Sequence, residues 1–102
     1  MKKYRISKSM KPYIRRILVR SFYRCRIEEK DGQIWCHTNA SSDTFHKIVQ
    51  RAKCEKASSE DGIFYVTAKE ANNALLLPVL LDQARTSVYR VIDDRQGERG
   101  IH

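Results

Sequence analysis

Apolar and polar positions between residues 10 and 29 fit two periodicities at once. The alternation from Ile17 to Ile27 is typical of a strand with one buried face. A helical stripe at i, i+3, i+4, i+7 and i+8 is formed by Met10, Tyr13, Ile14, Ile17 and Leu18. We predict a helix over about residues 9–19, with Ser9 able to act as its N-cap, and then a strand over about residues 21–29.

The strongest local turn signal is Asp31-Gly32. It lies between two strand-like segments, residues 22–29 and 33–38, and therefore predicts a β-hairpin. A further short strand is expected at the start of the chain, over Lys2–Ser7.

The second half of the chain alternates helical and extended segments. Ser41 or Ser42 can cap a helix that reaches Lys56 and buries Phe45, Ile48, Val49 and Ala52. A strand over residues 63–67 leads into a capping box, because Glu70 follows Thr67 by three residues. The helix that starts there is expected to kink or break near Pro78, and residues 87–92 form the last strand.

The element order β-α-β-β-α-β-α-β predicts an α+β protein, a small α/β sandwich of one domain over residues 1–92. Its first six elements follow the order of a ferredoxin-like sandwich, so one form of this prediction is that fold with an added C-terminal helix and strand. The length of 102 residues suits a single domain. Residues 93–102 are expected to form a flexible polar tail.

Targeting signals are not readable in the chain. The basic N-terminus is not followed by the apolar region of about 7–15 residues that a signal peptide needs. The longest apolar run, Ala74–Leu81, is shorter than the roughly 20 residues that span a bilayer. We expect a cytoplasmic protein without a membrane partner, whose cysteines, Cys25, Cys36 and Cys54, are reduced thiols.

Charge is confined to one end of the chain. Residues 1–30 contain eleven Lys or Arg against two acids, which gives +9, whereas the remaining residues contain nine against ten, which gives −1. This asymmetry predicts a polyanionic or acidic partner for the N-terminal third.

An Arg-rich surface with an aromatic residue is typical of nucleic-acid binding, because guanidinium groups pair with phosphates and a ring stacks on a base. If residues 16–26 are extended, one sheet face holds Arg16, Arg20, Phe22, Arg24 and Arg26. If residues 9–19 are helical, a solvent-facing cluster holds Lys8, Lys11, Arg15 and Arg16. We predict that Lys11, Arg15, Arg16, Arg20, Phe22, Arg24 and Arg26 bind nucleic acid, RNA ahead of DNA.

The competing prediction is a non-enzymatic interaction or inhibitor protein of the phage type. It would dock on an acidic protein surface or in the nucleic-acid channel of a partner. The apolar segment Leu75–Leu81 would be either a core helix or the interface of a homodimer.

Catalysis and cofactor binding have weaker support. Cys36, His37, His46 and Cys54 lack the spacing of a zinc site, so no metal and no cofactor is predicted. We expect no enzyme. The minor alternative is a small metal-free ribonuclease that uses His37, Tyr23 and Arg24.

Overall fold

The computed structural model describes residues 1–86 and 88–92 and shows an α+β protein. Contacts divide the chain into two compact units, Met1–Lys53 (unit 1) and Cys54–His102 (unit 2). The elements are β1 (Lys2–Ile6), α1 (Lys11–Arg20), β2 (Arg26–Lys30), β3 (Gln33–Thr38), α2 (Ser42–Asp61), β4 (Phe64–Thr67), α3 (Ala68–Asn72), α4 (Leu76–Ala84) and β5 (Tyr89–Ile92).

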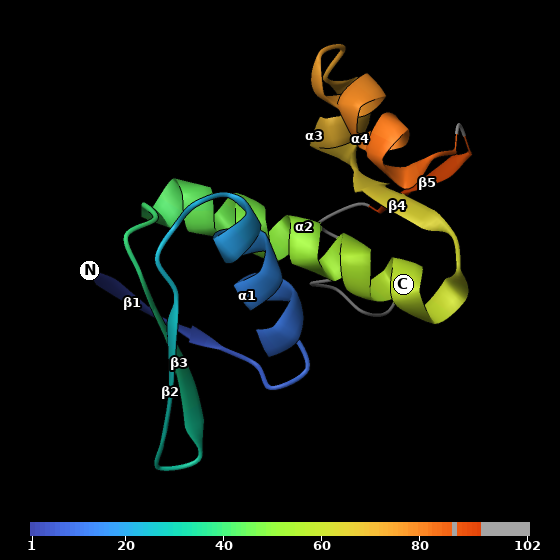
Figure 1. Cartoon of the computed structure of the whole chain (residues 1–102). Coiled ribbons are helices and arrows are strands. Elements are labelled where there is room, and N and C mark those ends of the chain that lie inside the picture. Colours follow the sequence, from blue (N-terminus) through green and yellow to red (C-terminus); the bar gives the residue numbers. More distant parts are fainter. Residues whose placement is uncertain (87, 93–102) are drawn as a thin grey trace. The chain divides into compact units, whose positions relative to one another are not determined.

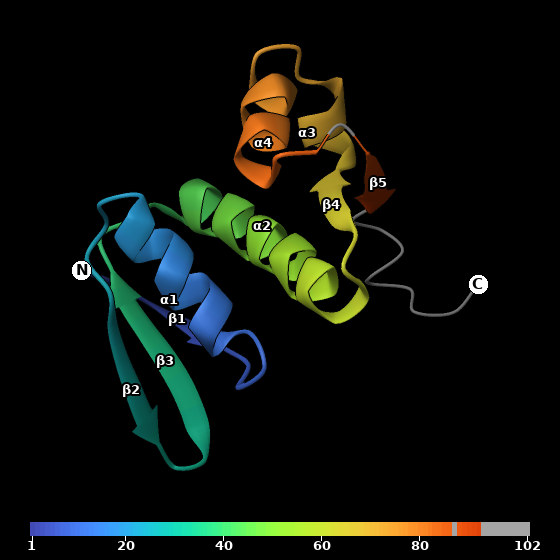
Figure 2. The same cartoon turned by 45° about the vertical axis from the view of Figure 1, so that its right-hand side comes forward.

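Unit 1 is a three-stranded antiparallel sheet covered on one face by two helices. The strand order is β1-β3-β2. Figures 1 and 2 show α1 and the first half of α2 on the same side of this sheet. The core between them contains Ile6, Ile14, Ile17, Leu18, Ile34, Cys36, Ala40, Phe45, Ile48 and Ala52.

Aromatic stacking fixes α2 to the first strand. The rings of Tyr4 and Phe45 lie 4.1 Å apart, centroid to centroid, and are parallel to within 7°. The Tyr4 hydroxyl also donates a hydrogen bond of 2.9 Å to the carbonyl of Ala40. The hydroxyl of the half-buried Tyr4 therefore has a partner, as a tyrosine that packs against a core requires.

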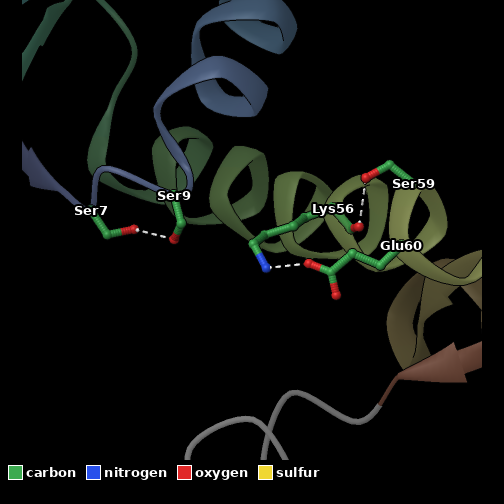
Figure 3. A network of polar contacts seen from close by, with 5 residues as sticks. All are labelled: Ser7, Ser9, Lys56, Ser59 and Glu60. Atoms are coloured by element: carbon green, nitrogen blue, oxygen red, sulfur yellow. Dashed lines mark hydrogen bonds and ion pairs between the residues drawn. The ribbon is translucent and has the colours of Figure 1, made fainter.

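The ambiguous segment folds as a helix, and the strand reading of residues 16–20 is wrong. In α1 the buried residues are Ile14, Ile17 and Leu18, whereas Val19 is 58% exposed. The strand reading would have buried Val19 and exposed Leu18. The helix N-cap is Met10 without a side-chain hydrogen bond, so Ser9 does not cap it, and the Ser9 hydroxyl lies 3.3 Å from that of Ser7 (Figure 3).

The predicted hairpin is confirmed. Lys30 pairs with Gln33, and the two residues between them have positive φ, 53° at Asp31 and 75° at Gly32. Positive φ at both central positions is the geometry of a type I′ turn, which matches the twist of the flanking strands. Helix α2 starts at Ser42 as expected but continues to Asp61, beyond the predicted end near Lys56.

The C-terminal half of α2 carries local polar contacts. Lys56 and Glu60 form an ion pair at i,i+4, and the Ser59 hydroxyl donates to the carbonyl of Lys56 at 2.9 Å (Figure 3). An exposed pair of this kind is worth no more than about 0.5 kcal/mol. It supports the helix without determining its length.

Unit 2 contains a parallel pair of strands, β4 and β5, and two short helices. The predicted capping box is present: the backbone N–H of Glu70 donates to the Thr67 hydroxyl, and that of Thr67 donates to the Glu70 carboxylate. The predicted long helix breaks after Asn72, and Pro78 lies in the first turn of α4, where its missing N–H costs little. Of the apolar run, Leu80 is buried but Leu75 is 85% exposed.

The ferredoxin-like form of the prediction is not confirmed. The sheet β1-β3-β2 would need β4 as a fourth strand, but β4 pairs with β5 in a second sheet. One domain over residues 1–92 stays a prediction. The predicted tail, residues 93–102, lies outside the described residues, and so does Ser87 of the last predicted strand.

Two neighbouring substitutions test the orientation of α1. Leu18 has no exposed surface, so Leu18→Ala should lower the free energy of unfolding by about 2–5 kcal/mol. Val19→Ala should change it by less than about 0.5 kcal/mol, because Val19 faces solvent and Ala favours the helix. Urea unfolding of both variants measures this, and a larger loss for Val19→Ala would restore the strand reading.

Candidate nucleic-acid interface

The face of the first sheet opposite the helices carries most of its polar side chains. In β3, Ile34, Cys36 and Thr38 are buried toward the helices, so Trp35 and His37 point to the other side. The strand register then places the outward residues of β1 and β2 beside them. We name this surface the open sheet face, and it consists of Lys3, Arg5, Arg26, Glu28, Lys30, Gln33, Trp35 and His37.

Trp35 occupies the centre of the open sheet face. It pairs with Arg5 on one side and with Glu28 on the other. The ammonium of Lys3 lies over its ring, with Nζ 4.6 Å from the ring centroid. A cation–π contact of this kind contributes about 0.5–1 kcal/mol at an exposed site. The ring is therefore half-buried on its own sheet and covered by a side chain that can move away.

The next row across the sheet consists of Lys3, His37 and Arg26. His37 Nε2 lies 2.9 Å from Glu28 Oε1, and because an ionised carboxylate can only accept, the ring nitrogen donates. The pKa of Glu28 is held below its usual value, first by this hydrogen bond and also by the charges of His37, Arg26 and Lys30, although desolvation opposes the shift. Glu28 is thus ionised at neutral pH.

The charge of the open sheet face follows from these residues. Four cations, Lys3, Arg5, Arg26 and Lys30, stand against the single carboxylate of Glu28, so these five side chains sum to +3. The carboxylate is already engaged by His37. An anionic chain on this face would meet Lys3 and Arg5 on the β1 side of Trp35, and Arg26 and Lys30 on the β2 side, two residues before and after Glu28.

A second cationic surface lies on α1. Its exposed side holds Arg15, Arg16 and Arg20 with the half-buried Lys11, and the helix contains no acid. We name these four residues the basic helix face. Because residues 11–20 are helical, the prediction that Arg16 and Arg20 share a sheet face with Arg24 and Arg26 is wrong. Of the predicted site residues, only Arg26 lies on the open sheet face.

Phe22 has an unusual backbone conformation in the loop between α1 and β2. Helix α1 ends in a Schellman motif, in which the N–H of Tyr23 bonds the carbonyl of Leu18 and that of Phe22 bonds Val19. The position in the left-handed region, usually glycine, is Phe22, with φ of 65° and 95% of its surface exposed. The backbone N–H of Arg24 donates to the Asn39 side chain oxygen at 2.9 Å, which ties this loop to the segment between β3 and α2.

Other contacts engage Tyr23, His37 and Cys36, which were considered above for catalysis or metal binding. Tyr23 packs against the core cluster, and His37 is engaged by Glu28. Burial and then the neighbouring thiol of Cys25, whose Sγ is 4.0 Å away, raise the pKa of Cys36 to about 12. Cys36 is therefore protonated at neutral pH and a poor nucleophile. Among residues 1–86 and 88–92, no cluster of three or more His, Cys, Asp or Glu could hold a metal ion.

The site residues that the sequence analysis missed are Lys3, Arg5, Lys30, Trp35 and His37. The alternation of Gln33–Thr38 already pointed Trp35 and His37 away from the core. The placement of Lys3 and Arg5 beside them depends on the pairing of β1 with β3, which no local pattern encodes.

Comparison with known proteins gives no relative from which a function could be taken. No family model, no curated protein and no solved structure matches the chain. Within the described part of the chain, none of the helices combines the length and the apolar character that crossing a membrane demands.

Phe22→Gly should stabilise the protein. Glycine adopts the left-handed conformation without the penalty of about 1–2 kcal/mol that a Cβ brings, and the exposed ring has little packing to lose. We expect a gain of about 1 kcal/mol, or about 4–8 °C in Tm by calorimetry. Phe22→Ala is the control, which keeps the Cβ and should gain nothing; an unchanged or lower Tm for Phe22→Gly would contradict the account.

Titration of Glu28 should show its link to His37. A carbon NMR titration is expected to find the pKa of the Glu28 carboxyl below its usual value in the wild type and nearer to it in His37→Asn. Because the folded-state pKa is the lower one, the pair stabilises the protein at neutral pH, and this contribution disappears as the pH falls through the folded pKa. Identical titration curves in both proteins would show that the hydrogen bond does not hold the carboxylate.

Proposed function

We propose that this protein binds single-stranded nucleic acid, RNA ahead of DNA, on the open sheet face. The observation that carries the proposal is the position of Trp35 at the centre of a sheet face whose rim is cationic. Unpaired bases can stack on such a ring, while the surrounding Lys and Arg contact the phosphates. The unit that carries this face has the first five elements of a ferredoxin-like sandwich in order, β-α-β-β-α.

The energies favour exchange of Lys3 for a base on the Trp35 ring. The cation–π contact of Lys3 is worth about 0.5–1 kcal/mol, whereas a stacked base contributes about 1–3 kcal/mol. The displaced ammonium remains at the rim, where it can pair with a phosphate. The bases of a duplex are already stacked on each other, so this gain applies to single strands.

The charge of the whole unit adds long-range attraction. Unit 1 contains fourteen Lys or Arg against four Asp or Glu, a net charge of +10, whereas unit 2 contains six against eight, a net charge of −2. The basic helix face, with Phe22 and Arg24 in the loop that follows it, supplies further contacts to phosphates outside the sheet. We place the protein in the cytoplasm as part of this proposal.

Fluorescence anisotropy with short labelled RNA, DNA and duplex DNA tests the proposal, from low to physiological salt. Trp35→Ala should weaken single-strand binding by about 5- to 150-fold, and Trp35→Phe by much less, because a ring remains for stacking. Four phosphate contacts would give a slope of log K against log salt near −3 for single strands. Arg26→Glu should reduce the affinity and the slope, whereas Lys47→Glu makes the same charge change on an exposed position of α2 and should change both less.

Other outcomes would contradict the proposal. Equal losses of affinity for Arg26→Glu and Lys47→Glu would mean that only the net charge of the protein determines binding. If the Trp35→Ala variant bound single strands as tightly as the wild type, the Trp35 ring would have no stacking role. No binding of free nucleic acid at physiological salt would turn the search to an acidic protein partner, which needs the cations but not the ring.

A further inference from the structure

Two of the three cysteines lie beside each other on the helix-covered side of the first sheet. Cys36 of β3 has no exposed surface and belongs to the core cluster, against which the half-buried Cys25 packs. Their sulfur atoms lie 4.0 Å apart. Heavy atoms within about 4.0–4.5 Å are in direct contact. Both thiols are free in this structure, so they form a pair of adjacent nucleophiles that the proposed function does not use.

The place of Cys25 in the chain allows the two sulfur atoms to come closer. A disulfide has an S–S distance of about 2.0 Å, so the thiols must approach each other by about 2 Å. Cys36 is held in the central strand, where it pairs with Tyr4 on one side and Ile27 on the other. Cys25 precedes β2, which begins at Arg26, and its backbone is therefore outside the strand pairing. Cys25 is the residue that can move.

The two thiols differ in accessibility and in acidity. Desolvation first, and then the charge of a Cys25 thiolate and the hydrogen bond between the thiols, raise the pKa of Cys36 to about 12. The half-buried Cys25 is therefore the thiol that a small oxidant meets first. Oxidation of Cys25 removes its thiolate charge and its thiol hydrogen bond, so only desolvation still raises the pKa of Cys36. The first oxidation step thus prepares Cys36 for the second.

We propose that Cys25 and Cys36 form a reversible disulfide on reaction with a peroxide, with Cys25 attacking first and Cys36 resolving. The Cys25 thiolate attacks one oxygen of hydrogen peroxide and the O–O bond breaks. The departing hydroxide takes up the proton that the Cys25 thiol released, which leaves a sulfenic acid and one water. The Cys36 sulfur then attacks the Cys25 sulfur, and the hydroxyl group leaves with the Cys36 proton as a second water.

The electrons balance over these two steps. The two thiols together lose two electrons, and one hydrogen peroxide is reduced to two waters. Two molecules of a small thiol such as glutathione reverse the reaction, because they form their own disulfide and restore Cys25 and Cys36 as thiols. The bridge lies on the covered side of the sheet, so this inference does not depend on nucleic-acid binding.

Mass spectrometry after peroxide treatment tests the bridge. The protein is unfolded and alkylated with iodoacetamide, which marks each remaining thiol. Untreated protein should take up three acetamide groups, one for each cysteine, whereas oxidised protein should take up one, on Cys54. Trypsin cleaves after Arg26 and Lys30, so Cys25 and Cys36 lie on separate peptides that only the bridge joins. Dithiothreitol should restore all three thiols.

Two variants serve as matched controls. Cys25→Ala removes the attacking thiol, so the variant should take up two acetamide groups both before and after peroxide treatment. Cys54→Ala leaves the pair intact and should take up two groups before treatment and none afterwards. The wild-type experiment needs neither variant, so the proposal stays testable even if a variant does not fold.

The melting temperature of the oxidised protein provides a second measurement. A bridge between residues that are 11 apart in the chain restricts the unfolded state, and we expect Tm to rise by about 5–10 °C. A lower Tm would mean that the folded protein does not accommodate the bridge, which overturns the proposal. Three alkylated thiols after peroxide treatment, oxygen added to Cys25 with Cys36 still free, or a bridge between two copies of the chain would overturn it as well.

Discussion

The one-sided covering of the first sheet is the constraint on which the rest of unit 1 depends. The fully buried Leu18 and its neighbours on α1 pack with the apolar stripe of α2 onto Ile6, Ile34 and Cys36. A three-stranded sheet whose apolar side chains alternate with polar ones has only one face to bury. The opposite face must then carry the polar and charged residues of the same strands, and Trp35 lies among them.

The cations of unit 1 follow from the same arrangement. None of the four cationic side chains on the open sheet face can enter the core, because burial of an unpaired charge costs several kcal/mol. The only carboxylate on that face, Glu28, is bound by His37. The result is a surface with positive charge at its rim and an aromatic ring at its centre, which combines the two attractions that a single strand offers, phosphate charge and base stacking.

Local signals in the sequence predicted those parts of the fold that short-range geometry decides. Asp31-Gly32 determines its own turn, and Thr67 and Glu70 form their capping box within four residues. Residues 16–20 fitted both a helix and a strand, and the packing of Leu18 against the sheet decided between them. The pairing of β4 with β5, and not with the first sheet, depends on contacts between distant residues.

The candidate site was predicted in part for the same reason. The sequence predicted the excess of positive charge at the N-terminal end and the place of Arg26 in the candidate site. The strand reading of residues 16–26, however, placed Arg16 and Arg20 beside Arg26. The outward direction of Trp35 and His37 followed from the alternation along their strand. Their neighbours Lys3 and Arg5 lie on β1, which α1 and β2 separate from β3 in the chain. Phe22 was expected to be exposed, but its left-handed backbone was not readable from the sequence.

The intrinsic fluorescence of Trp35 tests the central claim most directly, because it is the only tryptophan of the chain. A base stacked on the indole quenches its emission, so titration with single-stranded RNA should quench it with the same saturation curve as the anisotropy of the labelled strand. Duplex DNA should quench it less at equal occupancy. An anisotropy increase with unchanged Trp35 emission would contradict the account and place the bound strand on another surface of the protein.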